Sequence, residues 1–262
     1  MTTPAMHTAA TGMTTQETRT EIIANNLANV NTTGFKRSMP HFQDLLYQTI
    51  VAPGTPTGTT TMSPDGLQLG SGVRVVGTSR QFGQGSITTT NNPLDLAIEG
   101  NGFFAVQQAD GTPAYTRAGN LQTDGQGRIT TPEGLPVDPP ITIPAGSTSV
   151  SISANGIVTA TMSAQTTPVE IGRLTTATFI NPAGLQATGH NLFVATDASG
   201  QANIGEPGQD GHGTLLQGSL EQANVDIVEE MIGMISAQRA YEMNSKVVTS
   251  ADEMLKAATQ LQ

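Results

Sequence analysis

Two glycines separated by one residue are the first feature of the sequence that could do chemistry. They lie in the segment Glu99-Gly100-Asn101-Gly102-Phe103-Phe104. Glycine-rich turns can hold nucleotide phosphates, but a dinucleotide loop needs a third glycine and a following helix. A β pattern follows here instead, so the segment predicts a tight turn or bulge that leads into a strand.

Other reactive residue types are present without the spacing that a reaction centre needs. No His-x-x-x-His pair exists among His7, His41, His190 and His212, which argues against a zinc site, and His190 and His212 are expected in loops. Asp124-Gly125-Gln126-Gly127 lacks the repeated acidic ligands of a calcium loop and predicts a β-turn. The chain has no cysteine and no Gly-x-Ser-x-Gly motif. We therefore predict no catalytic residue, cofactor or metal ion. An enzyme acting on peptidoglycan and a surface adhesin remain alternatives.

Charge and composition narrow the possible partners. The net charge is −10, which disfavours nucleic acid and anionic membrane surfaces as partners. No run of 18 apolar residues is present, so we expect no membrane insertion. The segment Met1–Met13 lacks the basic and apolar regions of a cleavable secretory signal.

Both ends of the chain carry helical patterns. Thr3 and Pro4 suit a helix start, and a helix is expected from Pro4 to about Val30 with Gly34 as a stop. Its apolar residues recur at alternating spacings of three and four, but Gln16 and Thr20 weaken the centre of this stripe.

A second helix is expected from about Asn224 to the end, with Asp226 as its cap. One apolar stripe on it recurs every seven residues, at Ile227, Met234, Tyr241, Val248 and Leu255. A second stripe comprises Val247, Ala251, Met254, Ala258 and Leu261. The apolar face is therefore wide enough for more than one neighbour.

The region between the helices predicts β structure, so the fold class is α+β with the terminal helices pairing as a coiled coil. Asn155-Gly156 predicts a hairpin with a two-residue type I′ turn. Expected strands are Arg74–Phe82, Leu94–Gln107, Val150–Met162, Val169–Ile180 and Asn191–Thr196. The predicted domains are a helical domain over 1–34 and 224–262, an extended connector over 35–72 and a mostly antiparallel β domain over 73–223.

The terminal helices carry too little apolar surface to offset the conformational entropy of ordering them as an isolated pair. We infer that they become ordered when neighbouring molecules cover them, although a helical hairpin packed on the β domain would also fit the pattern. Four asparagines lie near the end of the first helix, at Asn25, Asn26, Asn29 and Asn31. They indicate either local bonds at a fraying helix end or hydrogen bonds across an interface between subunits.

Three segments, in order along the chain, resemble the bacterial flagellar rod and hook family. Ala24-Asn25-Asn26-Leu27-Ala28-Asn29-Val30-Asn31-Thr32-Thr33-Gly34-Phe35-Lys36-Arg37 is similar to its N-terminal motif. Ile98–Phe104 with Tyr115–Gly119 resembles its central motif, and Gln238–Lys246 with Asp252–Leu255 resembles its closing motif. The resemblance covers nearly the whole chain.

The resemblance implies a structural subunit that assembles helically into a tube, with the helices lining an export channel and residues 43–72 bridging layers. Chain length and Asp44–Ile50 favour the distal rod, with a proximal rod subunit as the alternative. Implied partners are further copies, proximal rod and hook-type subunits, the surrounding ring proteins and the flagellar type III export apparatus. The implied location is the basal body across the periplasm, reached without a cleavable signal.

The helical stripes and the resemblance together predict the residues that contact neighbouring subunits. They are Met13, Ile23, Asn25, Asn26, Leu27, Asn29, Val30, Gly34, Phe35, Ile227, Met231, Met234, Gln238, Arg239, Tyr241, Asn244, Val248 and Leu255.

Overall fold

The computed structural model describes residues 4–55, 65–163 and 167–260, which fall into two compact units. Unit 1 is drawn from residues 1–28, 38–79 and 226–262, and unit 2 from residues 29–37 and 80–225. A helix at each end flanks a mostly antiparallel β region, so the predicted α+β class is confirmed. Thr3, Leu261 and most of the expected connector between Pro53 and Gly66 lie outside the described residues.

The helices are α1 (Pro4–Ala28) and α2 (Ile227–Gln260), and a short 3-10 helix, η1, covers Pro182–Gly184. No helix in the described ranges is long and apolar enough to cross a membrane. The strands are β1 (Ser38–Asp44), β2 (Tyr47–Val51), β3 (Leu67–Gly70), β4 (Val73–Arg80), β5 (Ile87–Thr89), β6 (Leu96–Glu99), β7 (Phe103–Gln107), β8 (Pro113–Thr116), β9 (Gln122–Thr123), β10 (Ile129–Thr130), β11 (Ser147–Ile152), β12 (Ile157–Met162), β13 (Val169–Arg173), β14 (Thr176–Thr178), β15 (Gln186–Gly189), β16 (Leu192–Val194), β17 (Asn203–Gly205), β18 (Thr214–Gln217) and β19 (Ser219–Glu221).

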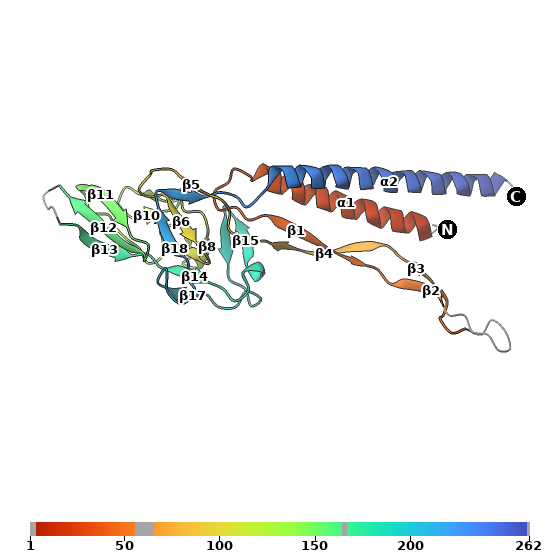
Figure 1. Ribbon diagram of the computed structural model, residues 1–262, viewed down its shortest axis with the longest axis horizontal. Helices are drawn as coiled ribbons and strands as arrows, with labels where there is room; N and C mark the ends of the chain where they lie inside the picture. The colour runs from red at the N-terminus through yellow and green to blue at the C-terminus, as the bar shows by residue number, and fades with distance from the viewer. Residues whose placement is uncertain (1–3, 56–64, 164–166, 261–262) are drawn as a thin grey trace. The chain divides into compact units, whose positions relative to one another are not determined.

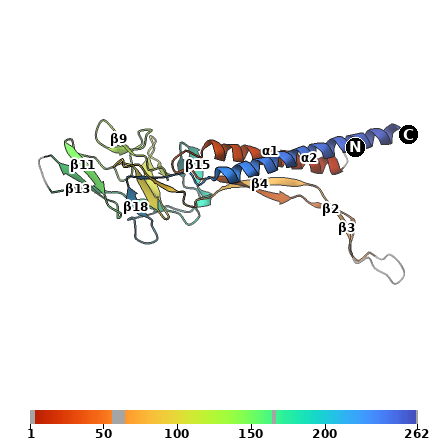
Figure 2. The same ribbon diagram turned by 45° about the horizontal axis from the view of Figure 1, so that its top comes forward.

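In unit 1, α1 and α2 lie side by side and antiparallel (Figures 1 and 2). The expected cap of α2 is confirmed, because an Asp226 side-chain oxygen accepts hydrogen bonds from the backbone N–H groups of Val228 (2.8 Å) and Glu229 (3.2 Å). The first helix ends at Ala28, two residues before Val30, where the chain turns.

The rest of unit 1 is built from two-stranded ribbons, in which β1 pairs with β4 and β2 with β3. Asn26 fixes this strand system to the helices. This residue is 1% exposed, and its side-chain amide exchanges two hydrogen bonds of 2.9 Å with the backbone of Ser38. The amide nitrogen also donates to the Glu230 carboxylate of α2 at 3.2 Å. One buried side chain therefore joins α1, α2 and β1.

The core of unit 2 surrounds a six-stranded antiparallel sheet in the order β15-β16-β8-β7-β14-β17. Successive residues of β7 alternate between two apolar clusters, with Phe104 and Val106 in one and Phe103 and Ala105 in the other. Both faces of the sheet are therefore buried, which explains why β7 reads as a continuous apolar run.

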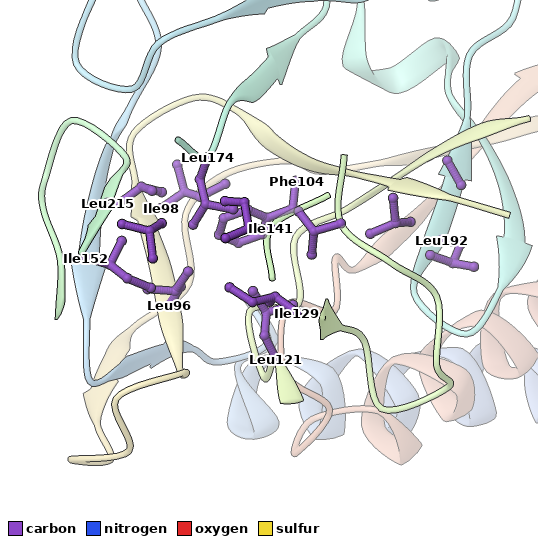
Figure 3. Close-up of a cluster of buried hydrophobic side chains, with 14 residues drawn as sticks. Leu96, Ile98, Phe104, Leu121, Ile129, Ile141, Ile152, Leu174, Leu192 and Leu215 are labelled. Atoms are coloured by element: carbon purple, nitrogen blue, oxygen red, sulfur yellow. The ribbon is translucent and has the colours of Figure 1, made fainter. Parts of the chain in front are cut away.

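The larger cluster, drawn in Figure 3, gathers Leu96, Ile98, Phe104, Leu121, Ile129, Ile141, Ile152, Leu174, Leu192 and Leu215 among its members. The smaller cluster concentrates the chain's few aromatic rings. Phe103 makes edge-to-face contacts with Phe82, Phe179 and Phe193, at centroid distances of 5.4–6.0 Å. Edge-to-face packing stabilises such pairs beyond their buried area.

The structure confirms most predicted turns and corrects one. Gly100 and Gly102 have positive φ and form the tight turn between β6 and β7, and Asp124 begins the turn between β9 and β10. The prediction of a type I′ turn at Asn155-Gly156 is wrong. Only Gly156 has positive φ there, and Ser153 and Ile157 close a three-residue loop that matches a type I turn with a bulge.

Three predicted strands are each divided, and one of them is Val150–Met162, in which the turn at Asn155-Gly156 separates β11 from β12. Leu94–Gln107 contains β6 and β7, separated by the glycine turn, and Val169–Ile180 contains β13 and β14, which belong to different sheets. His190 lies in a tight turn as predicted. His212 also lies outside the strands, but it is buried, with a ring nitrogen 2.9 Å from the Thr176 hydroxyl.

A buried ionic cluster of Lys36, Arg117 and Glu221 joins three distant parts of unit 2. The Glu221 carboxylate is fully buried and forms ion pairs with Lys36 (2.6 Å) and Arg117 (2.5 Å). Arg117 also donates to the backbone carbonyls of Ile98, Gly100 and Gly102, which fixes the glycine turn.

Gly34 lies beside this cluster at φ +70°, and its N–H donates to the Glu221 carbonyl at 2.8 Å. A Cβ atom at Gly34 would lie 2.6 Å from the backbone nitrogen of Ala118, so only glycine fits. The segments before β1 and after β19 are thereby fixed in unit 2.

We predict that Asn26→Ala loosens the attachment of β1. The change leaves the backbone N–H and carbonyl of Ser38 without their buried partner, which costs about 1–3 kcal/mol. Amide hydrogen exchange should show faster exchange at Ser38 by at least about tenfold. The exposed Asn31→Ala serves as control, and equal protection of Ser38 in both variants would contradict the assignment.

We predict that Glu221→Gln destabilises unit 2 strongly. The change leaves two buried cations without their anion, and such losses lower the free energy of unfolding by about 3–5 kcal/mol. Chemical denaturation followed by near-ultraviolet circular dichroism measures the effect. Glu133→Gln, at an exposed glutamate of the same unit, should change stability by less than about 0.5 kcal/mol.

The same carboxylate predicts an acid-dependent loss of stability. Burial raises the pKa of Glu221, but the charge of Arg117 and the charge and hydrogen bond of Lys36 outweigh burial, so the pKa lies below its ordinary value of 4.5. A carboxyl with a lowered folded-state pKa stabilises the fold fully above its unfolded pKa and loses this contribution as pH falls through the folded value. The stability difference between wild type and Glu221→Gln should therefore shrink below about pH 4.5. A difference that stays constant down to acid unfolding would contradict this assignment.

Candidate subunit interface

Small residues of each helix lie in the contact between α1 and α2. Ala9 and Ala237 are buried, a Cβ atom at Gly12 would lie 2.7 Å from the Asn244 amide nitrogen, and one at Gly233 would lie 3.3 Å from Ile23. The helices can therefore approach closely with little apolar area between them. Gln16, the residue expected to weaken the stripe, has a buried side-chain oxygen with no hydrogen-bond partner among the described residues.

Large apolar side chains of α2 are instead exposed. Val228, Ile232, Ile235 and Met243 are 66%, 63%, 49% and 61% exposed. Spacings of three and four residues place side chains on one helix face, and Arg239 and Lys246 continue the series. We call this set the α2 ridge: Val228, Ile232, Ile235, Arg239, Met243 and Lys246.

A groove of about 540 Å³ lies between the two helices of unit 1. It is lined by Glu17, Thr20, Glu21 and Ala24 of α1 and by Gln238, Tyr241 and Glu242 of α2. We call it the acidic groove, because three carboxylates line it and no lysine or arginine does. Glu17 and Glu21 are one helical turn apart, a spacing at which like charges repel.

The predicted interface residues divide into three groups by exposure. Ile23 and Asn26 are buried in unit 1, and Gly34 and Phe35 in unit 2, so their burial already has an intrachain cause. Those that are half-buried are Met13, Leu27, Asn29, Val30, Met234, Asn244, Val248 and Leu255. Those that are exposed are Asn25, Ile227, Met231, Gln238, Arg239 and Tyr241.

The sequence reasoning missed most of the α2 ridge and Glu221. Only Arg239 of the ridge was among the predicted contacts, because the stripe every seven residues from Ile227 follows the side of α2 nearer to α1. The apolar spacing of Val228, Ile232 and Ile235 was a signal that could have revealed a second face. For Glu221 no local signal existed, because its partners lie 104 and 185 residues away.

The α2 ridge and the acidic groove offer surface for contact with another molecule. Exposed apolar side chains at helical spacing suit burial against another helix, and the flanking charges suit selection of a partner and a register.

Models of known families match the two ends and the centre of the chain. Residues 6–36 match the family described as flagella basal body rod protein, and residues 97–160 match the D1 domain of the flagellar hook protein FlgE/F/G. Residues 216–261 match the C-terminal part of the flagellar basal body rod FlgEFG protein.

Individual relatives match over nearly their full length. The flagellar basal-body rod protein FlgG of Buchnera aphidicola subsp. Baizongia pistaciae is 48% identical, over 97% of both chains. FlgG of Caulobacter vibrioides is 48% identical over 98% of both chains, and FlgG of Bacillus subtilis is 37% identical over 96% of both. This chain therefore belongs to the flagellar FlgE/F/G rod and hook family and is a FlgG-like structural subunit of the flagellar rod.

Proposed function

We propose that the chain is a subunit of the distal rod, which assembles helically into a tube that transmits torque from motor to hook and encloses the export channel. The observation that carries the proposal is the exposed α2 ridge of unit 1. A proximal rod subunit is the alternative. Identities of 37–48% to seven FlgG proteins favour the distal assignment.

The exposed ridge argues for assembly because of its energetic cost in water. Burying one isoleucine side chain contributes about 1.5–3 kcal/mol, and several large apolar residues recur along a single helix face. Monomeric soluble proteins rarely expose a contiguous apolar surface of this kind without a partner. In this proposal, α1 and α2 pair as a coiled coil and neighbouring copies cover the ridge.

The proposal assigns a role to each predicted part of the chain. The helical domain (1–34 and 224–262) lines the channel, residues 43–72 of the connector (35–72) bridge layers, and the β domain (73–223) faces outward. Two-stranded ribbons such as β2 with β3 are marginally stable alone, and this one exposes Tyr47, Ile50 and Leu67. Contact with a neighbouring copy would cover these side chains as well.

The proposed partners follow from the family. They are further copies of the chain, proximal rod and hook-type subunits, the ring proteins around the rod and the type III export apparatus. The proposed location is the part of the basal body that crosses the periplasm. Helical arrays arise when a contact joins two different surfaces of one molecule and its rotation does not close.

We predict that Ile232→Glu weakens tube formation. The change places a charge in the apolar part of the α2 ridge and removes about 1.5–3 kcal/mol per buried contact, which raises the critical concentration at least about tenfold. Sedimentation and electron microscopy of the purified chain over a range of concentrations measure the critical concentration for tube formation. Far-ultraviolet circular dichroism checks that the variant remains folded.

The matched control is Ile180→Glu, because Ile180 is 94% exposed and lies in unit 2. Tubes should form with this variant as with wild type. A wild-type chain that stays monomeric at every soluble concentration, or unchanged assembly of Ile232→Glu, would contradict the proposed function.

A further inference from the structure

We propose that the acidic groove of one copy receives the α2 ridge of a second copy, with Arg239 and Lys246 entering among Glu17, Glu21 and Glu242. The inference rests on the proposed function and names the two surfaces that meet. It is a contact between different surfaces, so each copy offers both a groove and a ridge.

Unpaired charge is the first argument. Glu17, Glu21, Glu242, Arg239 and Lys246 are all exposed, and within the described parts of the chain none of them forms an ion pair. The three anions share the groove, whereas the two cations lie on the ridge. Glu242 also lies four residues before Lys246 on its own helix, a spacing that permits pairing within one copy. Glu17 and Glu21 have no cation in the groove that they line, and a second copy supplies it.

Spacing is the second argument. Asn26 contacts Glu230 and Gly12 approaches Asn244, so fourteen residues of α1 run against fourteen residues of α2 in the opposite direction. By this register Glu242 of α2 lies level with Thr14 of α1, and Thr14 is seven residues from Glu21 along α1. Arg239 and Lys246 are also seven residues apart, and seven residues of helix span about 10 Å.

Apolar contact is the third argument. Met243 is 61% exposed and lies between Arg239 and Lys246 in the sequence. Tyr241 is 45% exposed and, by the same register, lies between the levels of Glu21 and Glu242 in the groove. The thioether of Met243 and the ring of Tyr241 therefore meet when the charges pair, and contacts between sulfur and aromatic rings are favourable.

Charge reversal tests the contact. A ridge variant combines Arg239→Glu with Lys246→Glu, and a groove variant combines Glu17→Arg with Glu21→Arg. Each should raise the critical concentration for tube formation at least about tenfold, since like charges then face each other. The chain that carries all four changes should assemble at a concentration close to that of wild type.

Net charge provides an internal control. The ridge variant moves the net charge from −10 to −14, and the groove variant moves it to −6. If general repulsion governed assembly, the groove variant would assemble more readily than wild type. The proposed contact requires the groove variant to assemble less readily. Wild-type assembly in both paired variants, or no rescue in the fourfold variant, would overturn the inference and leave the proposed function intact.

Disulfide trapping tests the same contact even when no tube forms. The chain has no cysteine, so single-cysteine versions are unambiguous. Mild oxidation of mixed Thr20→Cys and Met243→Cys chains should give mixed dimers at least about tenfold above a Thr20→Cys and Ile180→Cys mixture. Equal yields would overturn the inference. Failure of the wild-type chain to form tubes would count against the proposed function, and the trapping result would still decide this contact.

Discussion

The packing of α1 against α2 is the constraint on which the assembly surface depends. Alanine and glycine residues of both helices lie in this contact, with Gly12 close to Asn244 and Gly233 close to Ile23, whereas Ile232, Met243 and other large residues of α2 are exposed. Close packing of small residues buries little apolar area per residue ordered, and folding must offset about 1–2 kcal/mol of backbone entropy per residue. In the proposed assembly, neighbouring copies cover the outward side chains and supply the apolar contact that the helix pair lacks.

Unit 2, in contrast, buries many of its large apolar side chains within its own core. Its sheet is buried on both faces, and the ionic cluster around Glu221 fixes the segments that precede β1 and follow β19. A fully buried carboxylate with two cationic partners tolerates little displacement, because separating them would leave unpaired charge in the interior. The chain thus combines a unit with a complete core of its own and a unit whose apolar surface is only partly used.

Features encoded by nearby residues could be predicted from the sequence, and those set by distant partners could not. Pro4, Asp226 and the turn glycines at 100 and 102 act within a few residues, so both helices and that turn were found. Strands of two to four residues, such as β5 and β19, depend on each other across the chain and leave no periodic pattern. The burial of Gly34, whose N–H donates to the Glu221 carbonyl, depends on such a long-range contact as well. The turn at Asn155-Gly156 is an exception, because nearby residues, Ser153 and Ile157, close the loop and the predicted turn type was still wrong.

Apolar area and charge have different roles in a repeating contact. An apolar helix face supplies free energy, but it permits sliding by a turn and pairing with many helices, which leads to irregular aggregates. Charges at fixed intervals penalise the wrong registers through like-charge contacts. Arg239 interrupts the apolar series of the ridge after Ile235, which lowers the hydrophobic gain there. That cost is consistent with a surface selected for one register, as a regular helical array requires.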